Sequence, residues 1–176
     1  IHQAKRSGAE ATLDQDFTFL LDDPYVSRRS ATQETEADSL ASIFSVRSTL
    51  LRYTEEEERI SFEEDVLRNY PDKTIVCVSS IAQFESLLQE IQIQDGALDK
   101  AQGPSSRILE NGGILLLDYD NFSASPEQLN SLFDDPPLYE GKELHQNLRI
   151  VGLVGKKGIK ENRYSSAFVS RWDQKM

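Results

Sequence analysis

Two acidic side chains directly follow a short apolar segment of the sequence. In residues 113–117 a glycine precedes four aliphatic residues, and Asp118 and Asp120 come next, separated by Tyr119. Such a run is typical of a strand buried in a sheet, and open α/β sheets bind ligands at the carboxyl ends of their strands. Two carboxylates there could hold Mg²⁺, which often takes one or two carboxylates together with phosphate oxygens. An acidic turn after a strand accounts for the same residues equally well.

The sequence around this segment alternates between strand and helix patterns. Apolar strands connected through helices imply a parallel sheet with helices on both faces. We therefore predict an α/β fold with three layers, α/β/α, and a mainly parallel sheet. The predicted strands are 74–78, 114–117 and 148–154, the predicted helices are 80–91, 106–110, 125–133 and 165–172, and polar loops are predicted at 94–104 and 155–158.

The part of the chain before residue 72 has a different pattern. Residues 1–30 contain one extended apolar run, 17–21, and we predict an extended arm or irregular segment there. The domain proper is predicted to cover 31–176, with a helical part at 32–69 and the β/α part at 72–176. The helical prediction rests on apolar residues that recur at three- and four-residue spacing. Within it, Thr54 and Glu57 have the spacing of a capping box, and the acidic run 55–58 suits a helix N-terminus.

Three blocks in the second half of the chain resemble parts of AAA ATPases of the dynein and midasin type. Residues 111–133 (NGGILLLDYDNFSASPEQLNSLF) resemble the Walker B region, and 145–154 (HQNLRIVGLV) resemble the strand that ends at the sensor 1 residue. Residues 164–172 (YSSAFVSRW) resemble the segment with the arginine finger, which would be Arg171. The blocks occur in the family's order and cover roughly residues 112–173. The resemblance implies a P-loop-NTPase-like fold in which Asp118 would support magnesium.

The sequence departs from that family at the positions that carry out hydrolysis. Tyr119 stands where the family has the glutamate that activates water, and a phenol with a pKa near 10 cannot replace a carboxylate base. Gly155 stands where the sensor 1 asparagine would position water. The phosphate-binding pattern G-x-x-x-x-G-K-[ST] is absent from the whole sequence. We therefore expect a degenerate domain without ATP turnover of its own, with Mg²⁺ and ATP as cofactors only if a phosphate loop is supplied elsewhere.

Composition and charge restrict the partners. Thirty acidic residues against 19 basic ones give a net charge of −11, whereas nucleic-acid binders need a basic face. We expect no nucleic-acid or membrane partner and a cytoplasmic protein, with Cys77 as the single cysteine. Because the chain begins at Ile1, we expect it to be a fragment of a larger protein. Its partners would then be another protein or other domains of the same large protein, and an oligomer is compatible with this role.

One alternative function stays open at this stage. The D-x-D pattern of Asp118 and Asp120 also resembles the opening of haloacid-dehalogenase-type phosphatases and of some PIN-like nucleases, where clustered acids bind metal or attack phosphate. That interpretation predicts a metal-dependent phosphatase or nuclease. Arg171 likewise has a simpler interpretation, as a surface arginine on the last helix. His2 and His145 are too isolated in the sequence to indicate a metal site.

Overall fold

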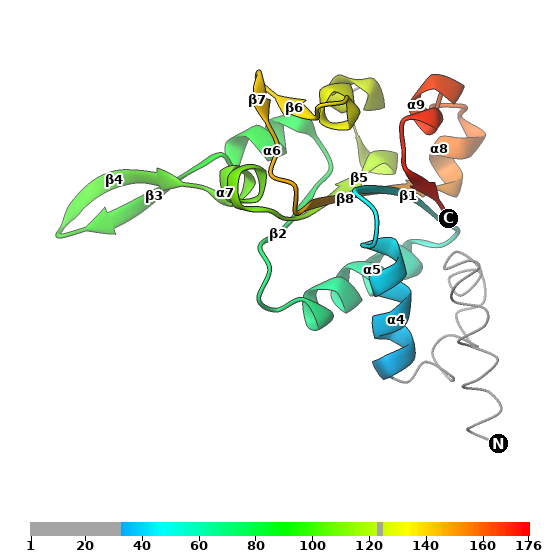
Figure 1. Ribbon diagram of the computed structural model, residues 1–176, viewed down its shortest axis with the longest axis horizontal. Coiled ribbons are helices and arrows are strands. Elements are labelled where there is room, and N and C mark those ends of the chain that lie inside the picture. The colour runs from blue at the N-terminus through cyan, green and yellow to red at the C-terminus, as the bar shows by residue number, and fades with distance from the viewer. Residues whose placement is uncertain (1–32, 123–124) are drawn as a thin grey trace.

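Five parallel strands form the central sheet of the computed structural model, which describes residues 33–122 and 125–176 (Figure 1). Their order across the sheet is β2 (Ile75–Val78), β5 (Gly113–Asp118), β8 (Leu148–Gly155), β1 (Ser48–Tyr53) and β9 (Gln174–Lys175). All neighbouring pairs are parallel. Strands β5 and β8 lie in the middle of the sheet, and every residue of β5 is buried.

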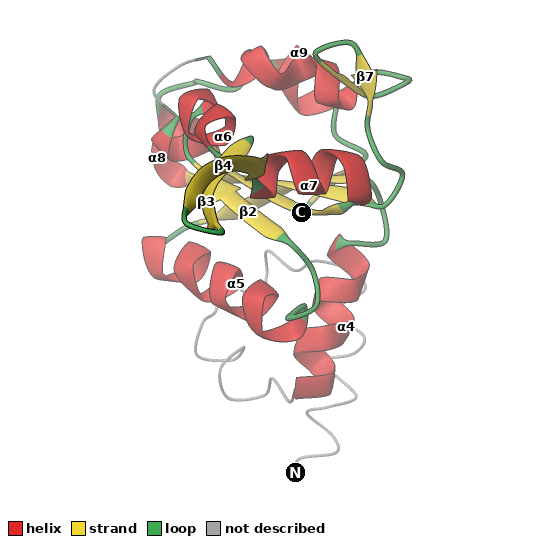
Figure 2. Cartoon of the chain, turned by 90° about the vertical axis from the view of Figure 1, so that its left-hand side faces the viewer, coloured by secondary structure: helices red, strands yellow, loops and turns green. Residues whose placement is uncertain are grey.

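Helices cover both faces of the sheet, so the molecule has the predicted three layers (Figures 1 and 2). One hydrophobic cluster joins α4 (Gln33–Ile43) and α5 (Glu56–Asn69) to one face, with Phe62 and Val66 of α5 fully buried against Ile114 and Leu116. A second, larger cluster fills the opposite face. The elements on that side are α6 (Ile81–Ser86), α7 (Pro104–Asn111), the 3-10 helix η2 (Pro126–Phe133), α8 (Lys156–Lys160) and α9 (Ser166–Ser170).

The predicted fold class is therefore confirmed, but the part predicted as helical at 32–69 also contains a strand, which the prediction missed. Strand β1 lies between α4 and α5, and five of its six residues are buried. A strand buried on both faces is a near-continuous apolar run, and its spacing cannot be told from that of a buried helix. Leu50 and Leu51 show why: they are adjacent in the sequence and both apolar, but their side chains point into the two different clusters.

A long β-hairpin replaces the loop predicted at 94–104, and it also shortens the helix predicted at 80–91. Strands β3 (Gln89–Gln94) and β4 (Ala97–Gln102) pair antiparallel and project away from the rest of the molecule (Figure 1). Asp95 and Gly96 form the turn with φ of 51° and 79°. Positive φ at both turn residues is the geometry that Asp-Gly favours in two-residue hairpin turns. Helix α6 consequently ends at Ser86, where the chain leaves for the hairpin.

The remaining differences concern the ends of elements. The predicted loop 155–158 is the start of α8, and the predicted last helix is shortened to α9, with Ser165 as its cap. The predicted strand at 74–78 exists as β2, but Cys77 is exposed because β2 is an edge strand. The other elements that were not predicted are η1 (Tyr119–Asn121), β6 (Leu138–Tyr139), β7 (Lys142–Glu143) and the edge strand β9. The arm predicted at 1–30 lies outside the described residues.

Helix α5 begins one residue later than its predicted capping box. Glu55 is the N-cap, and its side chain and that of Glu58 form the reciprocal capping bonds. The Glu58 carboxylate accepts from the backbone N–H of Thr54 at 2.8 Å and of Glu55 at 3.3 Å. Glu58 is buried as a result, so the acidic run is not simply a solvated helix start. Within the described ranges, none of the helices is long and apolar enough to cross a lipid bilayer.

The packing of β5 gives a first prediction. Leu115 is fully buried in the central strand, so Leu115→Ala removes apolar contacts and leaves a cavity. We expect the free energy of unfolding, measured by urea denaturation, to fall by about 2–5 kcal/mol. Ile91→Ala, in the hairpin, is the matched control because its side chain is 72% exposed. A change of similar size in both variants would contradict the described position of β5.

Candidate functional site

The candidate site lies at the carboxyl edge of the sheet, where β5, β8 and β1 end side by side. Asp118 is the last residue of β5 and its side chain is buried. Its Oδ2 accepts a hydrogen bond from the Asn121 side chain at 2.8 Å and lies 3.7 Å from the Arg59 guanidinium. Its Oδ1 is buried and has no hydrogen-bond partner in the described part of the chain. Burial raises the pKa of Asp118, although Asn121 and Arg59 act in the opposite direction.

Arg59 supplies the positive charge that faces Asp118. It lies in the second turn of α5 and forms ion pairs with Glu56 and with Glu63, the latter at 2.5 Å. Burial lowers the pKa of Arg59, but its bonds to Glu56, Asp118 and Glu63 raise it by more, so the guanidinium stays charged. Three carboxylates therefore share one cation that belongs to the chain itself.

Asp120 lies at the same edge but is held by different groups. Its Oδ2 accepts from the backbone N–H of Gly158, at the start of α8, at 3.2 Å, and its Oδ1 accepts from the hydroxyl of Tyr164. Arg163 also fixes the turn, because its guanidinium donates to the backbone carbonyl of Asp120 at 2.9 Å and to that of Phe122 at 2.5 Å. Both carboxylate oxygens of Asp120 are thus occupied by protein donors.

The phenol of Tyr53, at the end of β1, lies near both carboxylates. Burial raises the pKa of Tyr53, and the charges of Asp120 and Asp118 raise it further. The negative potential of the site therefore reaches across the edge from β5 to β1. A site of this sign attracts cations and repels phosphates unless a cation is bound.

Tyr119 is a core residue and does not face the site. Its side chain is fully buried, its ring packs edge-on against Phe168 at a centroid distance of 5.0 Å, and its hydroxyl has no hydrogen-bond partner within the described residues. Burial raises the pKa of Tyr119 above that of an ordinary phenol. The position that resembles that of the water-activating glutamate thus points into the hydrophobic cluster.

Gly155, at the position that resembles sensor 1, has no room for a side chain. A Cβ there would collide with Oδ2 of Asp120 and would lie 2.6 Å from the Tyr53 ring. Tyr53 is also the register partner of Gly155 in the neighbouring strand. The space that an asparagine side chain would need at this position is therefore already filled by two residues of the site.

The connection from β1 to α5 is where a strand–loop–helix phosphate site would be built in this sheet. It consists of Thr54 and Glu55 alone, and α5 begins at Glu56. Three of the backbone N–H groups here are bonded to glutamate carboxylates, those of Thr54 and Glu55 to Glu58 and that of Glu58 to Glu55. With Glu56 and Glu57 in the first turn, the helix N-terminus carries four consecutive carboxylates. These carboxylates repel the phosphates that a free helix N-terminus attracts.

Arg171 lies away from these residues. It forms the C-cap of α9 and its guanidinium pairs with Asp134 at 3.1 Å, with both side chains well exposed. Phe168 and Trp172, its neighbours in sequence, are buried. The structure therefore brings Asp118 and Asp120 to one edge and leaves Arg171 on the helical layer.

Metal binding by Asp118 and Asp120 would need further ligands. Among residues 33–122 and 125–176, no group of three or more His, Cys, Asp or Glu side chains is placed to hold a metal ion. The sequence analysis missed Arg59, Tyr53, Arg163 and Tyr164, which contribute most of the contacts and charges around the two aspartates. No sequence motif marks them, because they come from three separate segments, namely β1, α5 and the connection between α8 and α9.

Comparisons with known proteins give a limited result. No family model and no characterised protein matches the sequence significantly. Among solved structures, a full-length MCM homolog from Methanopyrus kandleri aligns with 98% of this chain at a TM-score of 0.48 and 13% sequence identity. The chain spans 40% of the length of that protein. Similarity at this level indicates neither a shared function nor shared site residues.

The raised pKa of Asp118 gives a second prediction, on the pH dependence of stability. Its folded-state pKa lies above the ordinary value of 3.8, so the folded state favours the protonated form. The contribution of Asp118 to the free energy of unfolding is therefore complete below the unfolded-state pKa, and it is lost as the pH rises through the folded-state pKa. Asp118→Asn keeps the shape without the charge. We expect its free energy of unfolding, minus that of the wild type, to increase as the pH rises from about 4.

Urea denaturation of both proteins at a series of pH values measures this difference, and the effects of groups that do not interact with Asp118 cancel in the subtraction. Asp72→Asn, at an exposed turn, is the control and should show no such trend. A difference that decreases with rising pH would mean that the ion pair with Arg59 outweighs the cost of burial.

Proposed function

We propose that this chain is a degenerate AAA-like domain that does not turn over ATP and serves as a structural or protein-interaction module of a larger protein. The observation that carries the proposal is the connection from β1 to α5. Two residues stand there in place of a phosphate loop, and the helix N-terminus is capped by Glu55 and Glu58. A triphosphate would meet four carboxylates at the point where it needs backbone donors and a lysine.

The order of the family-like segments in the fold supports the AAA-like part of the proposal. The Walker B-like segment is β5, the sensor 1-like segment is β8, and the two strands are parallel neighbours whose carboxyl ends adjoin. The strand that would lead into a phosphate loop, β1, pairs with the other side of β8. Asp118 occupies the position that resembles the magnesium-supporting residue. Its carboxylate faces α5 across the end of β8, and its neighbour there is the Arg59 guanidinium.

The departures from the family also fit one another. Tyr119 is locked in the core, Gly155 has no space for a side chain, and Asp120 caps α8. Each replaces a group that would position water or metal with a group that stabilises the fold. A domain that keeps the architecture but not these groups retains a surface for partners. We propose protein partners or other domains of the same protein, in a cytoplasmic setting and without nucleic acid or membrane binding, in keeping with the net charge of −11.

A phosphatase or nuclease built on Asp118 and Asp120 receives less support from the site. A nucleophilic or metal-binding aspartate needs free oxygens directed at the substrate. Both oxygens of Asp120 accept from protein donors, and Oδ2 of Asp118 accepts from Asn121, while its unpartnered Oδ1 is buried. We therefore do not extend the proposal to this enzyme class.

Nucleotide binding and hydrolysis test the proposal. Isothermal titration with MgATP should give no saturable heat, and phosphate release should stay at the buffer background. The physical reason is the capped, acidic N-terminus of α5. Asp118→Asn should leave both measurements, and the binding of any established protein partner, nearly unchanged, and so should the control Asp72→Asn. Hydrolysis that Asp118→Asn abolishes and Asp72→Asn preserves would overturn the proposal.

A further inference from the structure

The β3–β4 hairpin, which we call the arm, presents an apolar face with no covering layer. Ile91, Ile93 and Leu98 are 72%, 78% and 75% exposed, the largest values among the exposed large hydrophobic residues of the described chain. Ile93 pairs with Leu98 across the ribbon, and Ile91 is two residues from Ile93, so all three lie on one face. A two-stranded ribbon is marginally stable alone, and clustered exposed aliphatic side chains mark interaction surfaces.

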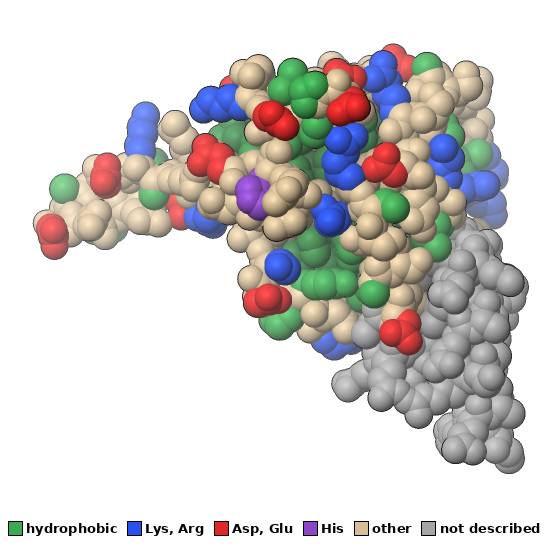
Figure 3. Space-filling model, viewed as in Figure 1, with side chains coloured by type: hydrophobic (Ala, Val, Ile, Leu, Met, Phe, Trp, Pro, Cys, Tyr) green, Lys and Arg blue, Asp and Glu red, His purple; other side chains and the backbone are tan. Residues whose placement is uncertain are grey.

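The acidic side chains of the arm lie in its turn and on its opposite face, whereas Lys100 lies on the apolar face opposite Ile91. Among residues 89–102 Glu90, Asp95 and Asp99 stand against Lys100, and Glu90 is ion-paired with Arg107 of α7 at 3.1 Å, which leaves Asp95 and Asp99 as the unpaired acids of the arm. Asp95 stands in the turn at the outer end of the arm, and Figure 3 shows acidic side chains along the arm together with hydrophobic ones. A partner for the arm therefore needs an apolar depression whose rim is basic.

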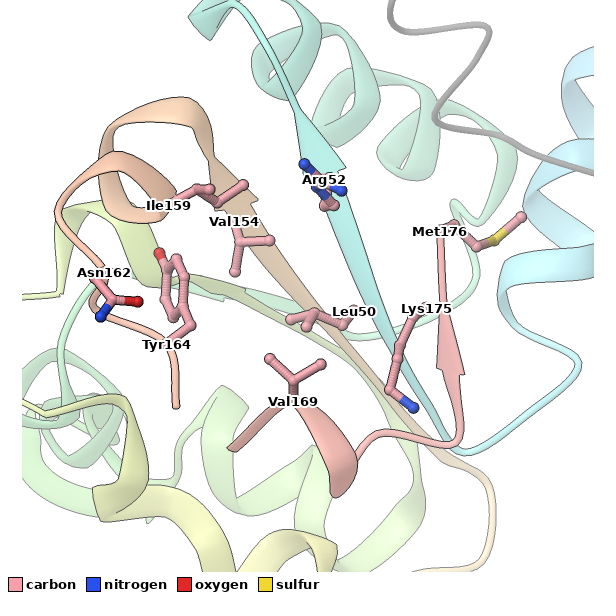
Figure 4. Close-up of a pocket in the computed structure, with 9 residues that line it drawn as sticks. All are labelled: Leu50, Arg52, Val154, Ile159, Asn162, Tyr164, Val169, Lys175 and Met176. Atoms are coloured by element: carbon pink, nitrogen blue, oxygen red, sulfur yellow. The ribbon is translucent and has the colours of Figure 1, made fainter. Parts of the chain in front are cut away.

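A cavity of this kind lies at the other end of the same molecule. It has a volume of about 460 Å³ and opens between β1, β9 and the α8–α9 segment (Figure 4). Its apolar wall combines buried strand residues with partly exposed helix and C-terminal residues, namely Leu50, Val154, Ile159, Val169 and Met176. The polar lining residues are Arg52, Asn162, Tyr164 and Lys175.

The charge of this cavity is opposite to that of the arm. Arg52 and Lys175 are exposed, form no ion pair with a side chain of the described residues, and share the lining with no Asp or Glu side chain. Two unpaired cations beside an apolar cavity contrast with a chain whose net charge is −11. Figure 1 places the arm and the α8–α9–β9 region at opposite ends of the molecule. The arm of a chain therefore cannot reach its own cavity without a large rearrangement of the fold.

We propose that the arm of one copy of this chain docks into the α8–α9–β9 cavity of a second copy. The contact joins two different surfaces and is head-to-tail, so it extends into rings or open chains of subunits. Apolar burial of Ile91, Ile93 and Leu98 drives it, and the acidic end of the arm meets Arg52 and Lys175. One hairpin end inserted into one cavity forms a small interface, so the association is weak and depends on protein concentration. It rests on the interaction role proposed above and involves neither Asp118 nor Arg171.

Sedimentation velocity over a wide range of protein concentration tests the contact with two variants. Ile93→Asp disables the arm and Ile159→Asp, at a 40% exposed side chain of the cavity, disables the cavity. The wild type should show a mass that rises with concentration, and each variant alone should stay monomeric. An equimolar mixture of the two should form a dimer, because the intact arm of one variant meets the intact cavity of the other.

Gln92→Asp, on the opposite face of the arm, and Ile60→Asp, on α5 at 43% exposure, are the matched controls and should associate like the wild type. The proposal is overturned if the wild type stays monomeric at every concentration, if the mixture stays monomeric, or if Ile159→Asp associates normally. If Ile159→Asp associates normally while Ile93→Asp stays monomeric, the association would involve packing of arm against arm. Failure of the contact leaves the absence of ATP turnover untouched, since the titration with MgATP does not depend on association.

Discussion

Burial of Asp118 and Asp120 at the carboxyl edge of the sheet is the constraint on which the site depends. A buried carboxylate is costly unless opposite charge or hydrogen-bond donors surround it. Here the compensation comes from the chain itself, through Arg59 for Asp118 and through Gly158 and Tyr164 for Asp120. These contacts tie α5, α8 and the segment before α9 to the end of β5. The same groups that hold the edge together therefore occupy the place of a ligand.

The acidic N-terminus of α5 belongs to the same arrangement. An N-terminus of a helix is a ready anion site, and α5 uses its own to bind glutamates. The cation nearest Asp118 is a guanidinium fixed by Glu56 and Glu63, which lie on the same helix. The chain itself thus supplies the cation that partly compensates the charge of Asp118. Among the described residues, the most exposed large hydrophobic side chains lie away from this edge, on the arm.

The sequence was sufficient for the fold class and for the central strands because β5 and β8 are long apolar runs between clear helix signals. It was insufficient where tertiary burial overrides local pattern. Strand β1 was taken for a helix because Leu50 and Leu51 face opposite layers, and the arm was taken for a loop although Asp95-Gly96 between Ile93 and Leu98 is a strong hairpin signal. The pairing of Asp118 with Arg59 joins positions 59 residues apart, so it could not be inferred without the fold.

Crystals grown or soaked with Mn²⁺ test most directly whether groups of the chain itself compensate the buried carboxylates of the two aspartates. The anomalous signal of manganese locates the ion without ambiguity. With the edge satisfied by protein groups, the map should contain no anomalous peak at Asp118 or Asp120, and Arg59 should remain beside Asp118. A manganese ion bound to both carboxylates, with the Arg59 guanidinium displaced, would contradict the account and favour a metal-dependent phosphatase or nuclease.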